Sequence, residues 1–435
     1  MSFNHGDESL SAVLSLYGGA PVRSNPLPSS LLGAALVGDL EEQAVLKVIQ
    51  NKSLFRHYGI GTPHFADDFE KRLRDYFGIP LALGVSSCSG ALQCAVNALG
   101  IGPGDEVILP AFAWLSCYNA IVLAGALPVF ADIDRSLNLD PADLERKITP
   151  ATKAVLVVHY QGGAARMDSI LEIAERAGIG VIEDVAQAMG GRYKGKLLGT
   201  LGDVSAFSMQ ANKILCTGEG GFLLTRRPEL FERAVRYHDL GKTRPTFRKQ
   251  MGVQLFARDE ADGFPGMQFR MSEVVAALGL AQFDRLDGMI ADCRRKNHRL
   301  QERLRDALPE IRFRDSPDPE GDLGITLFLD LGNPERGQLF SKAYKAEGFR
   351  VGPSSGMVNL LHLDYVRNRS LSHPALAPFG PGHSGASGWY SLGDAPRTDK
   401  ILDSMVGIAV GPLYSDEDME DIARGIIKVY KGLEI

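Results

Sequence analysis

A single lysine, Lys213, lies in the stretch FSMQANKILCTGEGG (residues 207–221), between small polar residues and a glycine-rich turn. A lysine on a solvated helix does not need such a setting, because water accommodates its charge. A lysine used as a nucleophile does, since Schiff-base chemistry requires a free amine fixed beside a carbonyl and backbone that can approach tightly. The setting therefore indicates a lysine that reacts with a carbonyl group.

A second candidate lies in the stretch IEDVAQ (residues 182–187), which closes an apolar run and holds Asp184 and Gln187 three residues apart. A carboxylate at the carboxyl end of a strand can act as a base, as a metal ligand or as the partner of a protonated ring nitrogen. It can equally be a helix cap or part of a structural ion pair. The aspartate alone does not decide among these roles.

Three further features could surround a cofactor. The stretch VSSCSGAL (residues 85–92) places hydroxyl residues and a glycine at a predicted helix start, where backbone N–H groups can cradle a phosphate, although serine and glycine also begin helices as caps. Trp114 follows a predicted strand and could stack on a flat ring or simply pack in the core. Ser208, five residues before Lys213, could add a hydroxyl to the phosphate cradle.

These features share one explanation. A phosphate site, an aromatic face, a carboxylate and a lysine are the parts that hold pyridoxal phosphate. Asp184 would keep the pyridine nitrogen protonated, because a nearby negative charge favours the cationic form. Lys213, once displaced by an incoming amine, would be the base that moves a proton between substrate and cofactor. The sequence thus predicts a pyridoxal-phosphate enzyme with Lys213 as its catalytic residue.

The elements that must position these residues follow an α/β pattern. From about residue 105, short apolar runs alternate with helical segments such as 168–178, which predicts a mostly parallel sheet covered by helices on both faces. Such sheets bind ligands beyond the carboxyl ends of their strands. A second alternation after residue 325 predicts a smaller α/β domain. We therefore expect an arm over residues 1–35, a large cofactor-binding domain over 36–290 and a small C-terminal domain over 291–435.

Local signals give further element predictions. Glycines and prolines before residue 35 favour an extended arm. Asp39 and Glu42 form a capping-box signature that predicts a helix start. The segment 271–295 is typical of one long helix, and the polar segment 241–266 is typical of a surface excursion.

Composition narrows the class of partner. The 435 residues are 45% hydrophobic and carry a formal net charge of -6, with a pI near 5.9, so the chain has no broad basic surface for nucleic acid or anionic membranes. We find no secretory signal and no apolar run near the ~18 residues of a membrane span, which predicts a cytoplasmic protein. The five cysteines include no CxxC pair, which indicates reduced, mostly buried thiols and no metal site.

The longer motifs resemble those of a known family. The stretches VSSCSGALQCAVNALGIGPGDEVILPAFAWLS, PVFADID and VIEDVAQAMGGRYKGKLLGTLGDVSAFSMQANKILCTGEGG are similar, in order and spacing, to the DegT/DnrJ/StrS family of pyridoxal-phosphate aminotransferases, which act on keto-sugars and keto-cyclitols. The resemblance extends from about residue 59 to 300. The phrases LYGGAPVR and AFSMQANK look most like the branch that aminates cyclitol ketones or makes aminobenzoate-type antibiotic precursors. The family resemblance implies the fold of type I aminotransferases and a homodimer with the cofactor site at the subunit interface.

The resemblance implies a role for each candidate residue: Lys213 forms the Schiff base, Asp184 pairs with the pyridine nitrogen, Gln187 contacts the ring-hydroxyl side, Trp114 stacks on the ring, and Ser208 holds the phosphate together with the backbone at Ser89 and Gly90. Gln268 stands where the family has an asparagine that reaches the neighbouring subunit's cofactor phosphate. Its extra methylene puts that contact in doubt. The residues at 88–90 also depart from the family's usual small residues, which leaves open which amides bind the phosphate.

The expected reaction is a ping-pong transamination in which an amino acid, glutamine or glutamate, loads the cofactor and a cyclic ketone accepts the amine. A dehydratase or eliminase that uses the same carbanion is the alternative. Family members that act as dehydratases carry histidine in place of the lysine, so Lys213 favours transamination. A pyridoxal-phosphate-dependent regulator would need a nucleic-acid module, and a nucleotide-binding protein would need a GxGxxG or GxxxxGK motif after an early strand; we find neither.

Overall fold

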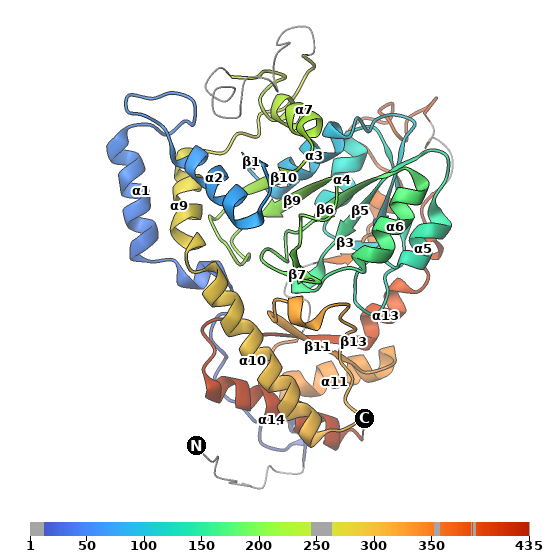
Figure 1. Ribbon diagram of the computed structural model, residues 1–435. Coiled ribbons are helices and arrows are strands. Elements are labelled where there is room, and N and C mark those ends of the chain that lie inside the picture. The colour runs from blue at the N-terminus through green and yellow to red at the C-terminus, as the bar shows by residue number, and fades with distance from the viewer. Residues whose placement is uncertain (1–12, 245–262, 352–356, 384, 386–388, 435) are drawn as a thin grey trace.

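The computed structural model of the chain describes residues 13–244, 263–351, 357–383, 385 and 389–434. Its centre is a seven-stranded sheet of order β1–β10–β9–β6–β5–β2–β4 (Figure 1). The strands are β1 (Leu81–Val85), β2 (Glu106–Pro110), β4 (Leu127–Ala131), β5 (Thr152–Val158), β6 (Gly180–Asp184), β9 (Val204–Ser208) and β10 (Gly221–Thr225). The strands from β9 to β4 run parallel, and β10 is antiparallel to both its neighbours. This confirms the predicted mostly parallel, mixed sheet.

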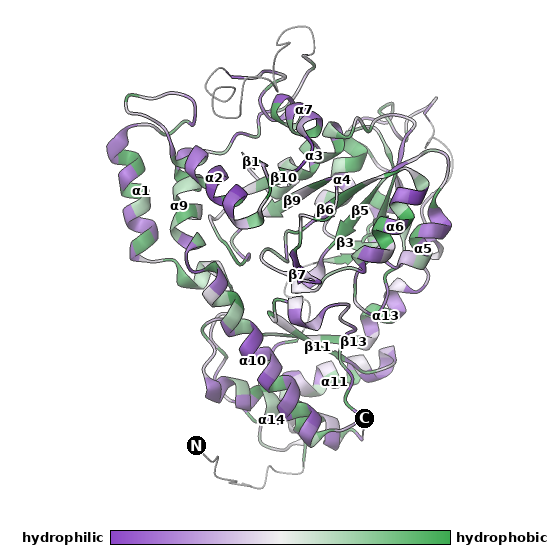
Figure 2. Cartoon of the chain, in the orientation of Figure 1, coloured by the Kyte–Doolittle hydropathy of each residue, from purple (hydrophilic) through white to green (hydrophobic). Residues whose placement is uncertain are grey.

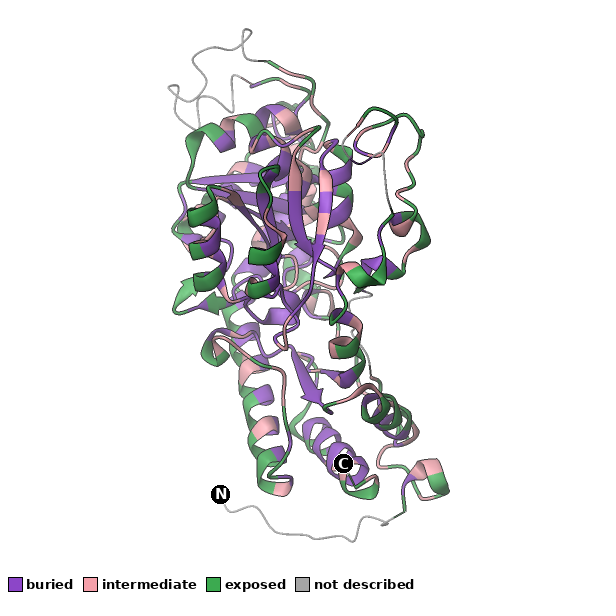
Figure 3. Ribbon diagram, turned by 90° about the vertical axis from the view of Figure 1, so that its right-hand side faces the viewer, coloured by how far each residue is buried: buried purple, intermediate pink, exposed green. Residues whose placement is uncertain are grey.

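Helices cover both faces of the sheet, and the strands are almost entirely buried (Figure 3). Successive strand residues point to opposite faces, so Leu109 lies in one apolar core and Ile108 in the other. The first core is covered by α3 (Cys88–Ala98), α4 (Leu115–Leu123) and α7 (Pro228–His238), and the second by α2 (Phe65–Phe77), α6 (Met167–Ala177) and α9 (Glu273–Phe283). Figure 2 shows hydrophobic strands inside and both hydrophilic and hydrophobic residues on α2 and α6.

A smaller unit follows the sheet in the chain. It contains the antiparallel pair β11 (Thr326–Asp330) and β13 (Met405–Ala409), with α11 (Pro334–Ala346) and α14 (Asp416–Gly432) around a third apolar core. Helix α13 (Thr398–Ser404) contacts α11, and its apolar residues pack against the first core. The long helix α10 (Leu286–Ala307) runs from the larger unit into the smaller one (Figure 1). The proposed domain boundary at 290/291 therefore falls inside α10, and the three-part division of the chain remains a proposal.

The N-terminal arm is anchored on this smaller unit. Leu14 is buried in the third core. Glu347, just after α11, accepts hydrogen bonds from the backbone N–H groups of Ser15 and Val22, at 2.8 and 3.1 Å. The same buried carboxylate pairs with Lys428 of α14 at 2.8 Å. A fully buried charge pair of this kind is stable only when its remaining hydrogen bonds are made, and here the arm makes them.

The arm then turns towards the larger unit. Arg23 forms ion pairs with Asp418 and Asp421 of α14, both at 2.8 Å. Ten residues later, the N–H of Gly33 donates to the carbonyl of Lys213 at 3.0 Å. The arm thus connects the last helix of the chain to the turn that carries the candidate lysine.

The first α-helix begins where its capping signature predicts, but with a different capping residue. The helix predicted to start at Asp39 is α1 (Asp39–Asn51), but the capping contact runs from the N–H of Gly38 to the carboxylate of Glu41 at 2.8 Å. The predicted pair of Asp39 and Glu42 is wrong by one residue, because Asp39 is already helical.

A short strand from the C-terminal half of the chain lies beside the start of α4. This strand, β12 (Val358–Asn359), pairs with β3 (Phe112–Ala113), which directly precedes α4.

The short helices α5 (Pro141–Lys147) and α12 (Asp364–Arg367) and the hairpin of β7 (Arg192–Tyr193) and β8 (Lys196–Leu197) complete the elements that flank the sheet. None of the helices in the described ranges is long and apolar enough to cross a bilayer.

Candidate active site

The predicted site residues gather at the carboxyl edge of the sheet. Asp184 ends β6 and Ser208 ends β9, and these two strands are parallel neighbours. β1 is antiparallel to β10, which is antiparallel to β9, so β1 also ends at this edge and α3 begins there. The structure therefore brings Asp184, Ser208 and the first turn of α3 to one edge, as the rule for parallel sheets predicts.

Lys213 lies in the turn that follows β9, and its backbone is fixed on both sides. Its N–H donates to the carbonyl of Gln210 at 2.8 Å, and its own carbonyl accepts from Gly33. Among the described residues, its ammonium group has no hydrogen-bond or ion-pair partner. Burial lowers the pKa of Lys213, and the neighbouring Cys88 and Asp184 only partly oppose this. A larger fraction of the amine is thus neutral and nucleophilic than on an exposed lysine.

Asp184 is only 4% exposed, and both of its carboxylate oxygens are held. Oδ1 accepts a hydrogen bond from the backbone N–H of Ala186 at 2.9 Å. Oδ2 accepts one from the thiol of Cys117 at 3.0 Å. Neither donor carries a charge, so within the described part of the chain the negative charge of Asp184 has no ion-pair partner. A buried carboxylate in this state is suited to bind a cationic group.

A second buried pair supports the strand that ends in Asp184. The ring of His159 accepts a hydrogen bond from the N–H of Ala165 at Nδ1, so its Nε2 donates to Glu183 at 3.0 Å. Burial tends to raise the pKa of Glu183, but the hydrogen bonds from His159 and from the N–H groups of Gly202 and Gly199 outweigh it and lower that pKa. Glu183 therefore remains a carboxylate, and it ties the end of β6 to the loop that precedes β9.

The start of α3 presents backbone N–H groups to the site. Ser87 caps the helix, because its Oγ accepts from the N–H of Gly90 at 3.1 Å and its carbonyl accepts from the N–H of Ala91 at 3.0 Å. No acceptor for the N–H groups of Cys88 and Ser89 is found among the described residues. Of the two predicted phosphate-binding amides, that of Gly90 is thus already used by the cap, whereas that of Ser89 remains available together with that of Cys88.

Close approach of β10 keeps this helix start in place. A Cβ added at Gly221 would lie 2.6 Å from the backbone nitrogen of Cys88 and 2.5 Å from the carbonyl carbon of Ser87. Only glycine fits at this distance. The Oγ atoms of Ser89 and Ser116 are 2.6 Å apart, which joins the first turns of α3 and α4. Trp114, the residue before α4, therefore lies near the start of α3, with 47% of its surface exposed.

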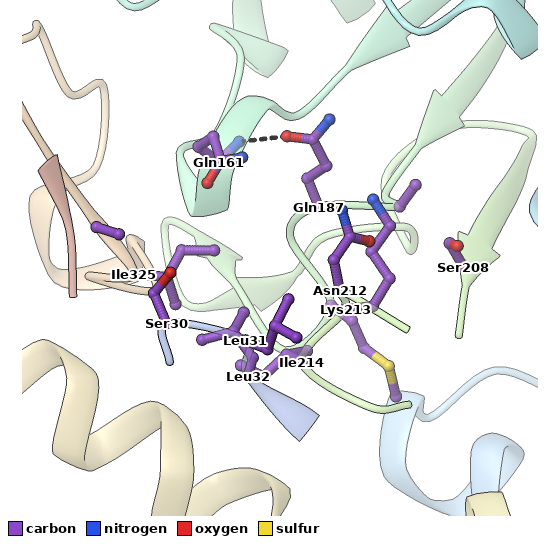
Figure 4. A pocket seen from close by; sticks show the side chains of 13 residues that line it. Ser30, Leu31, Leu32, Gln161, Gln187, Ser208, Asn212, Lys213, Ile214 and Ile325 are labelled. Carbon is purple, nitrogen blue, oxygen red and sulfur yellow. Dashed lines mark hydrogen bonds between the residues drawn. The ribbon is translucent and has the colours of Figure 1, made fainter. Parts of the chain in front are cut away.

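A small pocket of about 50 Å³ opens beside Lys213 (Figure 4). Lys213 and Asn212 point the same way from one turn, and Ser208 lies to one side. On the same side of the pocket, the side chain of Gln187 accepts a hydrogen bond from the backbone N–H of Gln161 at 3.4 Å. The remaining walls come from the arm and the smaller unit: Ser30, Leu31, Leu32, Ile325 and Ala409.

Several lining residues escaped the sequence analysis. Gln161 has a left-handed backbone (φ 46°), which is uncommon for a residue other than glycine and typical of functional sites. Asn212 has a buried Oδ1 with no hydrogen-bond partner among the described residues. Only the stretch NK at 212–213 could have drawn attention to Asn212. The arm residues lie about 180 positions away in sequence from Lys213, and no local pattern links them to it.

Of the predicted site residues, Lys213, Gln187 and Ser208 line this pocket, whereas Asp184, Trp114, Ser89, Gly90 and Gln268 do not. Gln268 is the one whose side chain is expected to reach the neighbouring subunit. Its side chain is exposed, although its backbone pairs with that of Asp239. The carbonyl of the next residue, Phe269, accepts the N–H of Ser86 at 2.7 Å, and its ring lies against Gly90, so Gln268 lies close to the start of α3 but is not among the residues that line the pocket of Lys213.

The chain is similar to known proteins over most of its length. A family model described as the DegT/DnrJ/EryC1/StrS aminotransferase family matches residues 38–347. Spore coat polysaccharide biosynthesis protein SpsC of Bacillus subtilis (strain 168) is 31% identical over 95% of this chain and 99% of its own. L-glutamine:2-deoxy-scyllo-inosose aminotransferase of Streptomyces kanamyceticus is 31% identical over 96% of this chain and 97% of its own.

Among solved structures, that of 3-amino-5-hydroxybenzoic acid synthase is similar with a TM-score of 0.74 at 26% identity, covering 94% of this chain and 99% of that one. The predicted fold of type I aminotransferases is thereby confirmed.

Proposed function

Because this chain belongs to the DegT/DnrJ/EryC1/StrS aminotransferase family, we propose that it uses pyridoxal phosphate to transfer an amino group from an amino acid to a cyclic ketone. The observation that carries the proposal is the position of Lys213. Its amine, which has no polar partner within the described ranges and a pKa lowered by burial, lines the pocket near the carboxylate of Asp184.

The chemistry of the surrounding groups fits this cofactor. The uncommitted N–H groups of Cys88 and Ser89 lie at the positive end of the α3 dipole, which suits a phosphate, and the hydroxyl of Ser208 is a further donor. Asp184 offers an unpaired buried carboxylate for a ring nitrogen that carries a proton. Trp114 offers an exposed aromatic face. We therefore assign these residues, with Gln187, to the cofactor.

When bound, pyridoxal phosphate supplies an aldehyde that exchanges amines and a ring that accepts electrons. The residues of this chain would supply the proton transfers. Lys213 is the group that can hold a proton and return it within the pocket, because burial lowers its pKa. Two neutral donors, the thiol of Cys117 and the N–H of Ala186, fix the carboxylate of Asp184 in one orientation.

The pocket lining supports a substrate rich in hydroxyl groups. Ser30, Gln161 and Asn212 contribute hydroxyl and amide groups, and the buried Oδ1 of Asn212 can accept a hydrogen bond from a bound molecule. The Streptomyces kanamyceticus relative is named for L-glutamine and for 2-deoxy-scyllo-inosose. We propose glutamine or glutamate as the amino donor and a keto-cyclitol or keto-sugar as the acceptor.

An absorbance titration tests the transamination. The cofactor-loaded protein is mixed with single amino acids, and glutamine or glutamate is expected to convert the bound cofactor to its amine form. Addition of a keto-cyclitol or a nucleotide-linked keto-sugar is then expected to reverse the spectral change and to yield a product that contains nitrogen. If no amino acid changes the spectrum, transamination is excluded. A ketone product without nitrogen supports the dehydratase alternative instead.

We also propose that the protein is a homodimer with its sites at the subunit interface. Trp114 and Gln268 are exposed in one chain, although both are assigned to the cofactor of one or the other subunit. On α1, the apolar side chains of Leu46 and Ile49, one helical turn apart, are exposed, which is typical of an interface. Sedimentation velocity is expected to show a single species of about twice the 47.1 kDa chain mass. A fully active monomer contradicts the proposal.

A further inference from the structure

The thiol of Cys117 is buried directly against Asp184. Cys117 lies in the first turn of α4, three residues after Trp114, and is fully buried. Its Sγ lies 3.0 Å from Oδ2 of Asp184, a short distance for a thiol donor. Oδ1 is already held by the N–H of Ala186, so the thiol is the second of two groups that fix the carboxylate.

The thiol of Cys117 is a neutral partner for a buried carboxylate. Burial raises the pKa of Cys117 well above its ordinary value, and the charge of Asp184 adds to this effect. The thiol is therefore protonated at neutral pH and acts as a donor. An arginine or a protonated histidine in its place would fix the carboxylate but also neutralise it. Cys117 fixes the carboxylate and leaves its charge for another cation.

The same turn of α4 carries two other parts of the site. Ser116 contacts Ser89 at the start of α3, with 2.6 Å between their Oγ atoms. Trp114 precedes the helix and shares its first turn, since the N–H of Cys117 donates to the carbonyl of Trp114 at 3.0 Å. The hydrogen bond between Cys117 and Asp184 thus joins the end of β6 to the turn that holds the aromatic residue.

We propose that Cys117 is a positioning residue that holds the carboxylate of Asp184 towards the cofactor and sets the place of Trp114 relative to it. The cofactor part of this inference rests on the proposed function, whereas the contact between Cys117 and Asp184 does not. The two parts can therefore be tested separately.

The contact is tested first in the cofactor-free protein, by a double-mutant cycle of Cys117→Ala and Asp184→Ala followed by thermal unfolding. The loss of melting temperature caused by Cys117→Ala is expected to be smaller in the Asp184→Ala background, because the hydrogen bond is already absent there. Cys94→Ala is the matched control, since Cys94 is another fully buried thiol but none of its described contacts is a hydrogen bond to a carboxylate. Its effect is expected to be the same in both backgrounds.

The positioning role is tested in the cofactor-loaded protein. Cys117→Ala is expected to lower kcat about tenfold with little change in the KM of the amino donor, because a hydrogen bond to a charged group is lost and a thiol is at the weak end of such donors. Cys117→Ser keeps a donor and is expected to restore most of kcat and the absorption spectrum of the bound cofactor. Cys94→Ala is expected to leave both unchanged.

If Cys117→Ala lowers the melting temperature equally in the two backgrounds, the hydrogen bond between Cys117 and Asp184 is disproved, whether or not the protein is a transaminase. Coupling without any change of kcat or spectrum, or a loss that serine does not rescue, overturns the positioning role. If the wild-type protein binds no pyridoxal phosphate, the proposed function fails, and with it the role of Cys117 towards the cofactor, while the cycle still decides the contact.

Discussion

Replacing Lys213 by alanine is expected to lower the rate of transamination by at least about 10³-fold, since it removes both the amine that binds the cofactor's aldehyde and the base that moves the proton. Steady-state assays measure the loss. Borohydride reduction followed by peptide mass spectrometry is expected to find a pyridoxyl group on residue 213 of the wild-type protein and none on the variant. Because the ammonium of Lys213 has no polar partner in the described part of the chain, the variant should unfold at nearly the wild-type temperature.

Lys71→Ala provides the matched control. Lys71 is exposed on α2 and pairs with Asp75 at 2.8 Å, one helical turn away. Such exposed pairs contribute little to stability, and this one is remote from the pocket lining, so activity and cofactor labelling should be unaffected. Turnover by the Lys213 variant at a rate near that of Lys71→Ala contradicts the assignment of Lys213 as the catalytic residue.

Replacing Asp184 by asparagine is expected to lower kcat by about 10²-fold or more, the scale on which a group that controls a proton acts. The amide has the shape of the carboxylate and can still accept from Ala186, but it lacks the charge that favours a protonated ring nitrogen. The measurements are kcat and the absorption of the bound cofactor as a function of pH. The spectrum should show a cofactor that loses its ring proton more easily than in the wild-type protein.

Asp203→Asn separates this effect from damage to β6. Asp203 accepts the N–H of Val181 at 2.8 Å and pairs with Arg227 at 2.9 Å, at the other end of the same strand. Its replacement should lower the melting temperature and leave kcat and the cofactor spectrum near their wild-type values. Similar losses of kcat in both variants would indicate that Asp184 acts only through the fold.

Much of the sheet could be predicted from local pattern alone. Strands that are buried on both faces need mostly apolar residues, and β5 and β6 show this in the runs AVLVV and GVI. The break in the helix that we expected over residues 271–295 could not be predicted from such a pattern. The helix stops at Phe283 and α10 starts at Leu286, while the side chain of Gln282 accepts the N–H of Cys216 at 2.7 Å. Such a contact joins residues 66 apart and leaves no periodic signal.

Some residues of the site could likewise be found from local pattern, and others could not. Asp184 and Ser208 could be found because each ends an apolar strand, and Lys213 because of its glycine-rich surroundings. The role of Cys117 could not be found in this way, since a cysteine within AWLSCYNAIV is typical of a core residue. Its carboxylate partner is brought to it only by the tertiary contact between α4 and the end of β6. Part of the predicted surface excursion at 241–266, namely residues 245–262, lies outside the described residues.

The anchoring of the arm fixes an order in which the pocket can be completed during synthesis. Ser30, Leu31 and Leu32 leave the ribosome early, but the ion pairs of Arg23 are made with α14, whose residues 416–432 are among the last to be translated. These contacts cannot exist on a nascent chain that lacks its final helix. The full anchoring of the arm is therefore completed only when translation is nearly finished, although Lys213, which receives the hydrogen bond of Gly33, is translated some two hundred residues earlier.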